Sequence, residues 1–265
     1  MDYSNAELMT VFLSRQIKDG EVIGGGGGGL PIPRAAQLLA HLSHGPNMKF
    51  HMIYRTSLFN EPSLSLSIFD HYVDWRHSRW AEAFWMPNEM FDEMRLMTKR
   101  VFFMSGMQVD KFGNANLFGI GKNYNKLDIR GPGSLGSPTV TTYANRYYLI
   151  VPKHNRRSLV EQCDFITCFG WGKGGKDART KLGLPGGGPA GCMTPLCYMD
   201  FDEESKKMRV KYLHPGVSIE KVIENTGFEL VVPASVPETP LPTENELEIL
   251  RTRIDTEGIL RRLTL

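Results

Sequence analysis

The chain has little net charge and no long apolar segment, and each absence excludes a class of protein. Its 31 basic and 29 acidic residues leave a formal charge of +2, which predicts no strong attraction to nucleic acid or to a membrane surface. No apolar run approaches the roughly 18 residues that a membrane-spanning helix needs. Residues 1–7 are polar and acidic, unlike a secretory signal peptide. We therefore expect a cytoplasmic protein.

Cysteine is scarce, and its spacing gives no clear ligand set. Cys163 and Cys168 form one pair, and Cys192 and Cys197 form the other, with four residues inside each pair. That separation is at the upper limit for structural zinc sites. The segment between Cys163 and Cys168 is strand-like, so the two side chains would point to opposite faces. We expect reduced thiols, no metal and no permanently bound cofactor.

Strand-like and helix-like segments alternate along the chain, which predicts an α/β fold with parallel strands built from βαβ units. The aromatic-rich residues 69–97 are expected to form two helical pieces. Residues 170–191 are expected to form a Gly/Pro/Lys-rich loop or lid. Residues 233–242 are expected to form an extended proline-rich strap. The predicted helices cover residues 5–19, 33–44, 218–225 and 244–253, and the predicted strands cover residues 21–23, 50–54, 100–104, 145–152, 163–169, 194–201 and 208–213.

Six consecutive glycines occupy residues 24–29, between a predicted strand and a predicted helix. Bare backbone before a helix start allows a polar or phosphorylated ligand to approach main-chain N–H groups, and Gly26 and Gly28 are the candidates here. No Gly-Lys-Ser/Thr follows, so the run is not a Walker A loop. A Rossmann-type nucleotide site and a flexible linker both remain open.

A second candidate follows the predicted strand at residues 100–104. Ligands in α/β sheets bind beyond the carboxyl ends of parallel strands. Gln108, Asn114 and Asn116 offer uncharged amides there, suited to a carbonyl or a hydroxyl. The alternative is a structural turn held by the same side chains.

The stretch Gly-x-Gln-Val-Asp-x-x-Gly-Asn-x-Asn at residues 106–116 resembles the signature of the β subunit of family I coenzyme A transferases, especially the glutaconate CoA-transferase branch. The resemblance extends over nearly the whole chain, in order. The other matching segments are residues 8–25, the Leu-Pro and Ala-rich helix from residue 30, and residues 130–136, 182–187, 213–218 and 225–230.

This resemblance implies an open, mostly parallel α/β sheet flanked by helices, in one domain over residues 1–265 that ends in the strap and terminal helix at 233–265. It also implies a homologous α subunit, with heterodimers assembling to a heterotetramer or larger. Coenzyme A is then part of the substrate, and the acyl-CoA site lies between the subunits. The aromatic-rich residues 69–97 are a reasonable part of that interface.

The sequence departs from the family where it matters for the reaction. Family transferases attack the acyl thioester with a glutamate in a Glu-Ser/Thr-Gly context at the end of the second strand. The corresponding residues 52–57 contain no carboxylate. Arg55 is always protonated and cannot replace it, while Tyr54 and Ser57 have no evident neighbouring base. The nearest carboxylate is Glu61.

Two functions compete on this evidence. Loss of the nucleophile slightly favours the family branch that hydrolyses carbon–carbon bonds or decarboxylates acyl-CoAs, in which Arg55 would hold a substrate carboxylate. Genuine CoA transfer through Glu61 is the alternative. A non-catalytic scaffold subunit that shapes the α subunit's site is another, and a nucleotide-dependent oxidoreductase is more distant.

A glycine-rich loop at residues 131–136 is the remaining candidate. Backbone N–H groups of Gly131, Gly133, Ser134 and Gly136 are placed to stabilise an oxyanion on a thioester carbonyl or an enolate. The alternative is a tight structural turn. His51, His71 and His77 are nearest the predicted site, but each is expected to be structural or on the surface, and His154 and His214 suggest no specific role.

Overall fold

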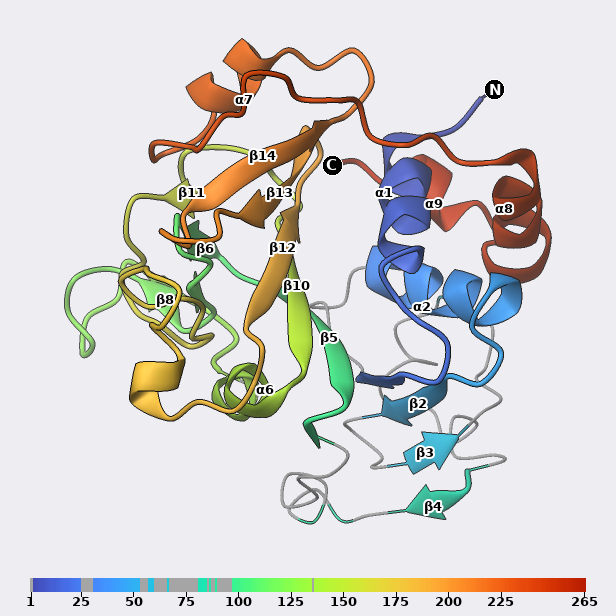
Figure 1. Cartoon of the computed structure of the whole chain (residues 1–265), viewed down its shortest axis with the longest axis horizontal. Helices are drawn as coiled ribbons and strands as arrows, with labels where there is room; N and C mark the ends of the chain where they lie inside the picture. The colour runs from blue at the N-terminus through green and yellow to red at the C-terminus, as the bar shows by residue number, and fades with distance from the viewer. Residues whose placement is uncertain are drawn as a thin grey trace. The chain divides into compact units, whose positions relative to one another are not determined.

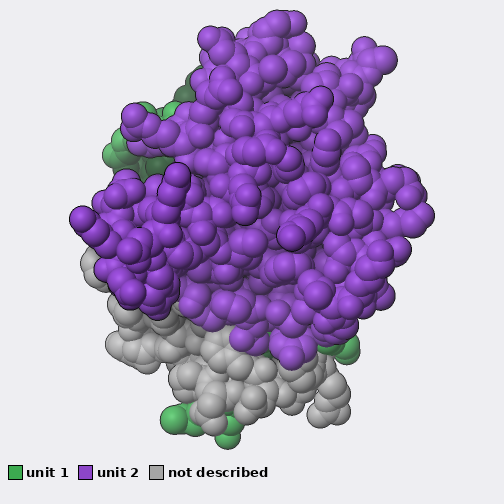
Figure 2. Space-filling model, turned by 90° about the vertical axis from the view of Figure 1, so that its left-hand side faces the viewer, with its two compact units in different colours: residues 1–103, 240–265 green, residues 104–239 purple. Residues whose placement is uncertain are grey.

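The computed structural model describes residues 2–24, 31–52, 57–59, 66, 81–84, 86, 89, 97–134 and 136–265 (Figure 1). The chain forms two compact units, coloured separately in Figure 2. Unit 1 comprises residues 1–103 and 240–265, and unit 2 comprises residues 104–239. No helix within the described ranges is long and apolar enough to cross a membrane. The prediction of a single domain over residues 1–265 stays a prediction.

The sheet of unit 1 is parallel around a short first strand. β1 (Val22–Gly24) pairs in parallel with β2 (Lys49–Met52) on one side and with β5 (Arg100–Ser105) on the other. β3 (Ser57–Phe59) and β4 (Ala83–Phe84) then continue the sheet antiparallel to β2. The strand order β5-β1-β2-β3-β4 leaves the carboxyl ends of β1 and β2 at the same edge.

Helices from both ends of the chain complete unit 1. α1 (Asn5–Ser14) packs against α2 (Pro31–Ser43), and both contact the C-terminal segment. That segment contains α8 (Glu244–Ile249), the π-helix η3 (Leu250–Ile254) and α9 (Ile259–Arg262). Figure 1 shows the blue N-terminal helices beside the red C-terminal ones. Most of the apolar side chains on these helices are buried and belong to the core of this unit.

A capping box starts α1 and also ties it to the C-terminal segment. Ser4 Oγ accepts the Glu7 N–H at 3.2 Å, and Glu7 Oε2 accepts the Ser4 N–H at 2.7 Å. Arg251 Nε donates to Glu7 Oε1 at 2.7 Å. Burial alone would raise the pKa of Glu7, but the bonds from Arg251 and Ser4 outweigh it and lower this pKa.

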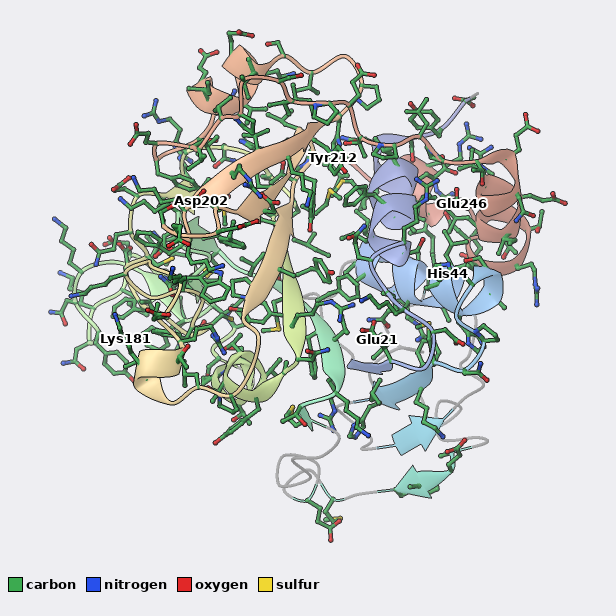
Figure 3. The ribbon with its side chains drawn as sticks, in the orientation of Figure 1. Glu21, His44, Lys181, Asp202, Tyr212 and Glu246 are labelled. Carbon is green, nitrogen blue, oxygen red and sulfur yellow. The ribbon has the colours of Figure 1, made fainter. Side chains whose placement is uncertain are left out.

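The same arrangement occurs at the start of α8. Thr243 and Glu246 form the predicted capping box, which is confirmed. Arg15, just after α1, donates to Glu246 through Nε at 2.8 Å and through a terminal nitrogen at 2.6 Å. Glu246 is labelled in Figure 3. Each helix-starting glutamate therefore pairs with an arginine from the other end of the chain.

The main strands of unit 2 follow the order β10-β12-β13-β14. β10 (Arg146–Ile150) and β12 (Pro189–Met193) are parallel, whereas β13 (Cys197–Phe201) and β14 (Met208–Leu213) form an antiparallel hairpin that extends the sheet. Part of the proline-rich strap runs beside β14, since Leu213 N–H donates to the Pro237 carbonyl at 3.0 Å. The predicted α/β class, with an open sheet flanked by helices, is confirmed.

Two small sheets and three short helices surround these strands. β6 (Gln108–Asp110) lies between β7 (Ala115–Asn116) and β11 (Leu159–Val160), and β8 (Gly119–Ile120) pairs with β9 (Ile129–Arg130). The short helices are α6 (Ser137–Tyr143), the 3-10 helix η2 (Thr180–Leu182) and α7 (Ile219–Glu224).

Several element predictions are wrong in detail. Residues 163–169 form no strand: apart from a bridge between Cys168 and Ala115, the segment consists of bends that bond to the β6–β7 hairpin. β12 begins inside the predicted loop 170–191. Ala83–Phe84, expected to be helical, pairs with β3. α1 ends at Ser14, whose Oγ bonds the Val11 carbonyl at 2.8 Å.

Candidate functional site

A buried amide–carboxylate pair holds the turn between β6 and β7. Asp110 accepts the Asn114 Nδ2 group on both carboxylate oxygens, at 3.1 and 2.9 Å, and also accepts the N–H groups of Phe112 and Asn114. Burial raises the pKa of Asp110, although these bonds oppose the rise. Asn114 Oδ1 in turn accepts the N–H groups of Gly170 and Gly172 at 2.9 and 3.2 Å.

The other two predicted amides form a second buried group. Gln108 Oε1 accepts the Asp164 N–H at 3.0 Å and an Asn116 Nδ2 hydrogen at 2.8 Å. Asn116 Nδ2 also donates to the Gly119 carbonyl at 2.7 Å, and Asn116 Oδ1 accepts the Phe118 N–H at 2.9 Å. Gln108 Nε2 donates to Asp164 at 3.3 Å.

These contacts use all four hydrogen-bonding positions of Asn114 and of Asn116, and three of the four of Gln108. All three side chains are buried. The geometry therefore favours the structural alternative for the amides, and their role in binding stays a prediction. Sequence reasoning missed Asp164, because nothing in its local pattern indicates a contact with residues 108 and 121.

We expect Asn114→Ala to destabilise the protein by about 2–4 kcal/mol, because it leaves the Asp110 carboxylate and two backbone N–H groups without their buried partner. Denaturant unfolding measures this change, with the exposed Asn125→Ala as the control. Unchanged stability with reduced turnover would instead assign Asn114 to substrate binding.

The glycine-rich loop at residues 131–136 is anchored beside these amides. The N–H groups of Gly131 and Gly133 donate to the carbonyls of Phe118 and Leu117 at 2.8 and 3.1 Å. A Cβ at Gly131 would collide with the Leu117 carbonyl oxygen and lie 2.6 Å from Met107 Sδ, so this close approach requires glycine. Ser134 O accepts the Ser137 N–H at 2.8 Å, leading into α6.

The structure thus brings two of the predicted groups together in unit 2. Asn116 holds the N–H of Phe118, and the Phe118 carbonyl holds the N–H of Gly131. Gly136 precedes α6 with a left-handed φ of 79°, which glycine adopts without strain. The oxyanion role of Gly131, Gly133, Ser134 and Gly136 remains untested.

Two buried basic side chains lie near the end of β2 in unit 1. His51 is 1% exposed, and its Nε2 lies 3.5 Å from a terminal nitrogen of Arg100, which is fully buried. Burial, assisted by the Arg100 charge, lowers the pKa of His51 to about 3, so the ring is neutral near pH 7. His51 is therefore a buried structural residue, as the sequence predicts.

Ser57 is the one predicted catalytic residue that lies within the described part of the chain. It opens β3 opposite Met52 of β2, so four residues connect these strands. The candidates outside the described part are Gly26, Gly28, Tyr54, Arg55 and Glu61, together with His71 and His77 and most of the aromatic-rich residues 69–97.

Residues 6–225 match the family model described as Coenzyme A transferase. The chain belongs to the coenzyme A transferase family. It is 40% identical to the B subunit of 3-oxoadipate CoA-transferase from Pseudomonas knackmussii over 253 residues, covering 94% of this chain and 92% of that protein. This family membership confirms the resemblance inferred from residues 106–116.

Other members of the CoA-transferase family align over different extents. The B subunit of glutaconate CoA-transferase from Acidaminococcus fermentans is 30% identical, covering 96% of this chain and 93% of the relative. A crystal structure of glutaconate CoA-transferase from that organism superposes with a TM-score of 0.86 at 26% identity, covering 99% of both chains. The cholesterol ring-cleaving hydrolase IpdB subunit of Mycobacterium tuberculosis is 30% identical, covering 67% of this chain and 69% of that protein.

Proposed function

We propose that this chain is the β subunit of a heteromeric enzyme that processes acyl-CoA thioesters together with a homologous α subunit. Support comes from the relatives, whose names identify them as B subunits of CoA-transferases and as the IpdB subunit of a hydrolase. Two of these relatives are matched over more than nine-tenths of their length.

Within this class, we propose hydrolytic carbon–carbon bond cleavage or decarboxylation of a carboxylated or cyclic acyl-CoA. One observation carries the choice: the connection between β2 and β3 consists of Ile53, Tyr54, Arg55 and Thr56, with no carboxylate. CoA transfer through a covalent intermediate requires a nucleophilic carboxylate that forms an anhydride and then a thioester. Removing that group while keeping the family fold eliminates the transfer step and leaves the acyl-CoA site.

The proposed residues suit such a reaction. Arg55 offers a planar, permanently charged fork that binds a substrate carboxylate with two hydrogen bonds. When the bond between the carbon α to the thioester and a further carbon breaks, its electron pair stays with the α carbon and delocalises onto the thioester oxygen as an enolate. Backbone N–H groups of Ser134 and Gly136 would stabilise this oxygen, since those of Gly131 and Gly133 already donate to the Phe118 and Leu117 carbonyls. A proton delivered to carbon completes the reaction. The base that activates water in the hydrolytic case would come from the α subunit.

CoA transfer is a second candidate, favoured by the 40% identity to a 3-oxoadipate CoA-transferase subunit. In that case a carboxylate elsewhere in this chain must act as the nucleophile, and Glu61 is the nearest in sequence. The transferred group would travel as an acyl–glutamyl anhydride, with CoA held as a glutamyl thioester.

Chemical trapping on the co-purified complex tests this choice. The complex is incubated with carboxylated acyl-CoAs, treated with hydroxylamine or borohydride, and measured by intact mass and by product analysis. We expect turnover without an adduct on this chain. A modified carboxylate, at Glu61 or elsewhere, would establish CoA transfer and overturn the proposed reaction.

Restoring the nucleophile gives a complementary prediction. Tyr54→Glu is expected to form a trappable glutamyl thioester with CoA, whereas Tyr54→Gln, of the same shape, is not. Arg55→Ala is expected to raise KM for a carboxylated acyl-CoA more than for an uncharged one. Unchanged turnover in both Tyr54→Gln and Arg55→Ala would favour the scaffold role of this subunit.

A further inference from the structure

An exposed aromatic stack projects from the β8–β9 hairpin of unit 2. The rings of Phe118 and Tyr124 are stacked, with centroids 4.8 Å apart and planes within 5°. Phe165 meets both rings edge-on, at 5.2 and 6.3 Å. Tyr124 nevertheless remains 66% exposed. The stack therefore ends in an aromatic ring available to a further planar group.

Three cations belong to the hairpin that carries this stack. The Arg130 guanidinium lies 5.2 Å from the centroid of the Phe118 ring. Lys122 and Lys126 are exposed in the turn that carries Tyr124. Within the described part of the chain, none of these three cations forms an ion pair. The only carboxylate of the hairpin itself is Asp128, so its cations outnumber its anions.

The stack is held in place by the buried amide groups. Asp164, which bonds Gln108, also accepts the Gly121 N–H at 2.9 Å and so fixes the start of the turn. At the other end of the hairpin, the Phe118 carbonyl accepts the Gly131 N–H. Phe118 therefore links the exposed stack directly to the glycine-rich loop proposed to stabilise the thioester oxygen.

We propose that the exposed face of Tyr124, with Lys122, Lys126 and Arg130, binds the 3′-phosphorylated ADP portion of the CoA substrate. The inference rests on the proposed function, in which acyl-CoA is the substrate. That portion is the one part of CoA that is both planar and multiply anionic. Adenine stacks on an aromatic face without needing a specific edge contact, and its phosphates pair with flanking cations.

The charges favour a nucleotide over a protein at this surface. An apolar protein partner covering Tyr124 would remove three cations from water without compensation, which is costly. A nucleotide with several phosphate charges supplies that compensation. A protein partner at the same surface is therefore an outcome of the test that would overturn the proposal.

Kinetics on the assembled complex test the subsite. For Tyr124→Ala and for Lys126→Glu, we expect KM for acyl-CoA to rise about tenfold with kcat nearly unchanged, as loss of one stacked base implies. The same variants should process the matching acyl-pantetheine, which lacks the nucleotide, as the unmodified complex does. Ile223→Ala, at an exposed apolar position of α7, is the control.

Calorimetric titration with adenosine 3′,5′-bisphosphate tests nucleotide binding at Tyr124 independently of the proposed reaction. We expect binding to the unmodified complex and its loss in Tyr124→Ala. If the complex binds the bisphosphate in this way yet turns over no acyl-CoA, the proposed reaction fails and the subsite stands. Equal KM changes for acyl-CoA and acyl-pantetheine, no KM change, or release of the α subunit from Tyr124→Ala would each overturn the subsite.

Discussion

Arg179→Met is expected to destabilise unit 2 by about 3–5 kcal/mol and to open residues 170–188 to protease. Arg179 is 3% exposed and lies in the loop between β11 and β12, just before η2. Its five N–H groups donate to five backbone carbonyl oxygens, at 2.6–3.3 Å. The acceptors are Phe169, Gly170, Gly186, Thr141 and Thr142. Removing the guanidinium leaves buried carbonyls without these donors.

The hydrogen bonds of Arg179 argue against a mobile lid at residues 170–191. The sequence allowed a surface excursion or a lid at residues 170–191, but one side chain joins both ends of the loop to the last turn of α6. A mobile lid would not use a buried cation in this way, because each opening would break five hydrogen bonds. Burial lowers the pKa of the Arg179 guanidinium.

Limited trypsin digestion and denaturant unfolding measure the effect. Lys173, Lys176 and Lys181 lie in the same loop and are exposed, and Lys181 is labelled in Figure 3. We expect rapid cleavage there in Arg179→Met and also in Arg179→Lys, since an ammonium has only three donors. Arg156→Met, at an exposed position, is the control. Unchanged stability and unchanged cleavage would show that the guanidinium does not hold the loop.

Local sequence signals located the helices and long strands well. The Thr-x-x-Glu pattern at residues 243–246 predicted the start of α8, and the same spacing at Ser4 and Glu7 starts α1. The apolar run at residues 100–104 coincides with all but the last residue of β5, and the run at 145–152 contains β10. Such signals work because they depend on neighbours three or four residues away in the chain.

Contacts between distant segments were beyond local reasoning. Residues 163–169 have the apolar character of a strand, but Gln108 and Asn114 bond their backbone and that of the residues that follow, which prevents a regular ladder. β12 begins with a proline and contains one glycine, and its pairing with β10 makes it a strand. Sequence spacing contains no information about such partners.

In the candidate site, too, local motifs could be predicted from the sequence whereas contacts between distant residues could not. Residue types and motif order were enough to identify the family, and the structure gives Gly131 and Asn116 of these motifs a close approach and buried hydrogen bonds. The amides of Gln108 and Asn114 looked equally suited to a ligand or to a turn. Only the count of their hydrogen bonds in the structure favours the turn.

Two linked histidines make the stability of unit 2 sensitive to acid. His154 Nδ1 lies 2.8 Å from Thr194 Oγ1, and His154 Nε2 lies 3.0 Å from Thr226 Oγ1. His214 Nε2 lies 2.9 Å from the Thr194 carbonyl, to which it must donate. Burial lowers the pKa of both histidines to about 4, and the nearby His214 charge also opposes protonation of His154.

Acid lowers the stability of the protein because its buried histidines bind protons less readily in the folded state than in the unfolded state. A histidine in the unfolded chain takes up a proton near pH 6.5, whereas His154 and His214 resist it until about pH 4, and His51 until about pH 3. Protons therefore bind the unfolded state preferentially as the pH falls below 6.5. Stability is fully present above this pH and is lost on acidification, until the folded protein also becomes protonated.

We expect the free energy of unfolding to fall between pH 6 and pH 4 by up to about 4 kcal/mol per pH unit, since each of three histidines contributes about 1.4. Denaturant unfolding at intervals of half a pH unit measures this slope. His214→Gln should reduce it by about a third whatever its effect on absolute stability, whereas His44→Gln, at an exposed position, retains all three buried rings and the full slope. An equal slope in His214→Gln and the unmodified chain would show that His214 is protonated in the folded protein, contrary to its buried, hydrogen-bonded position.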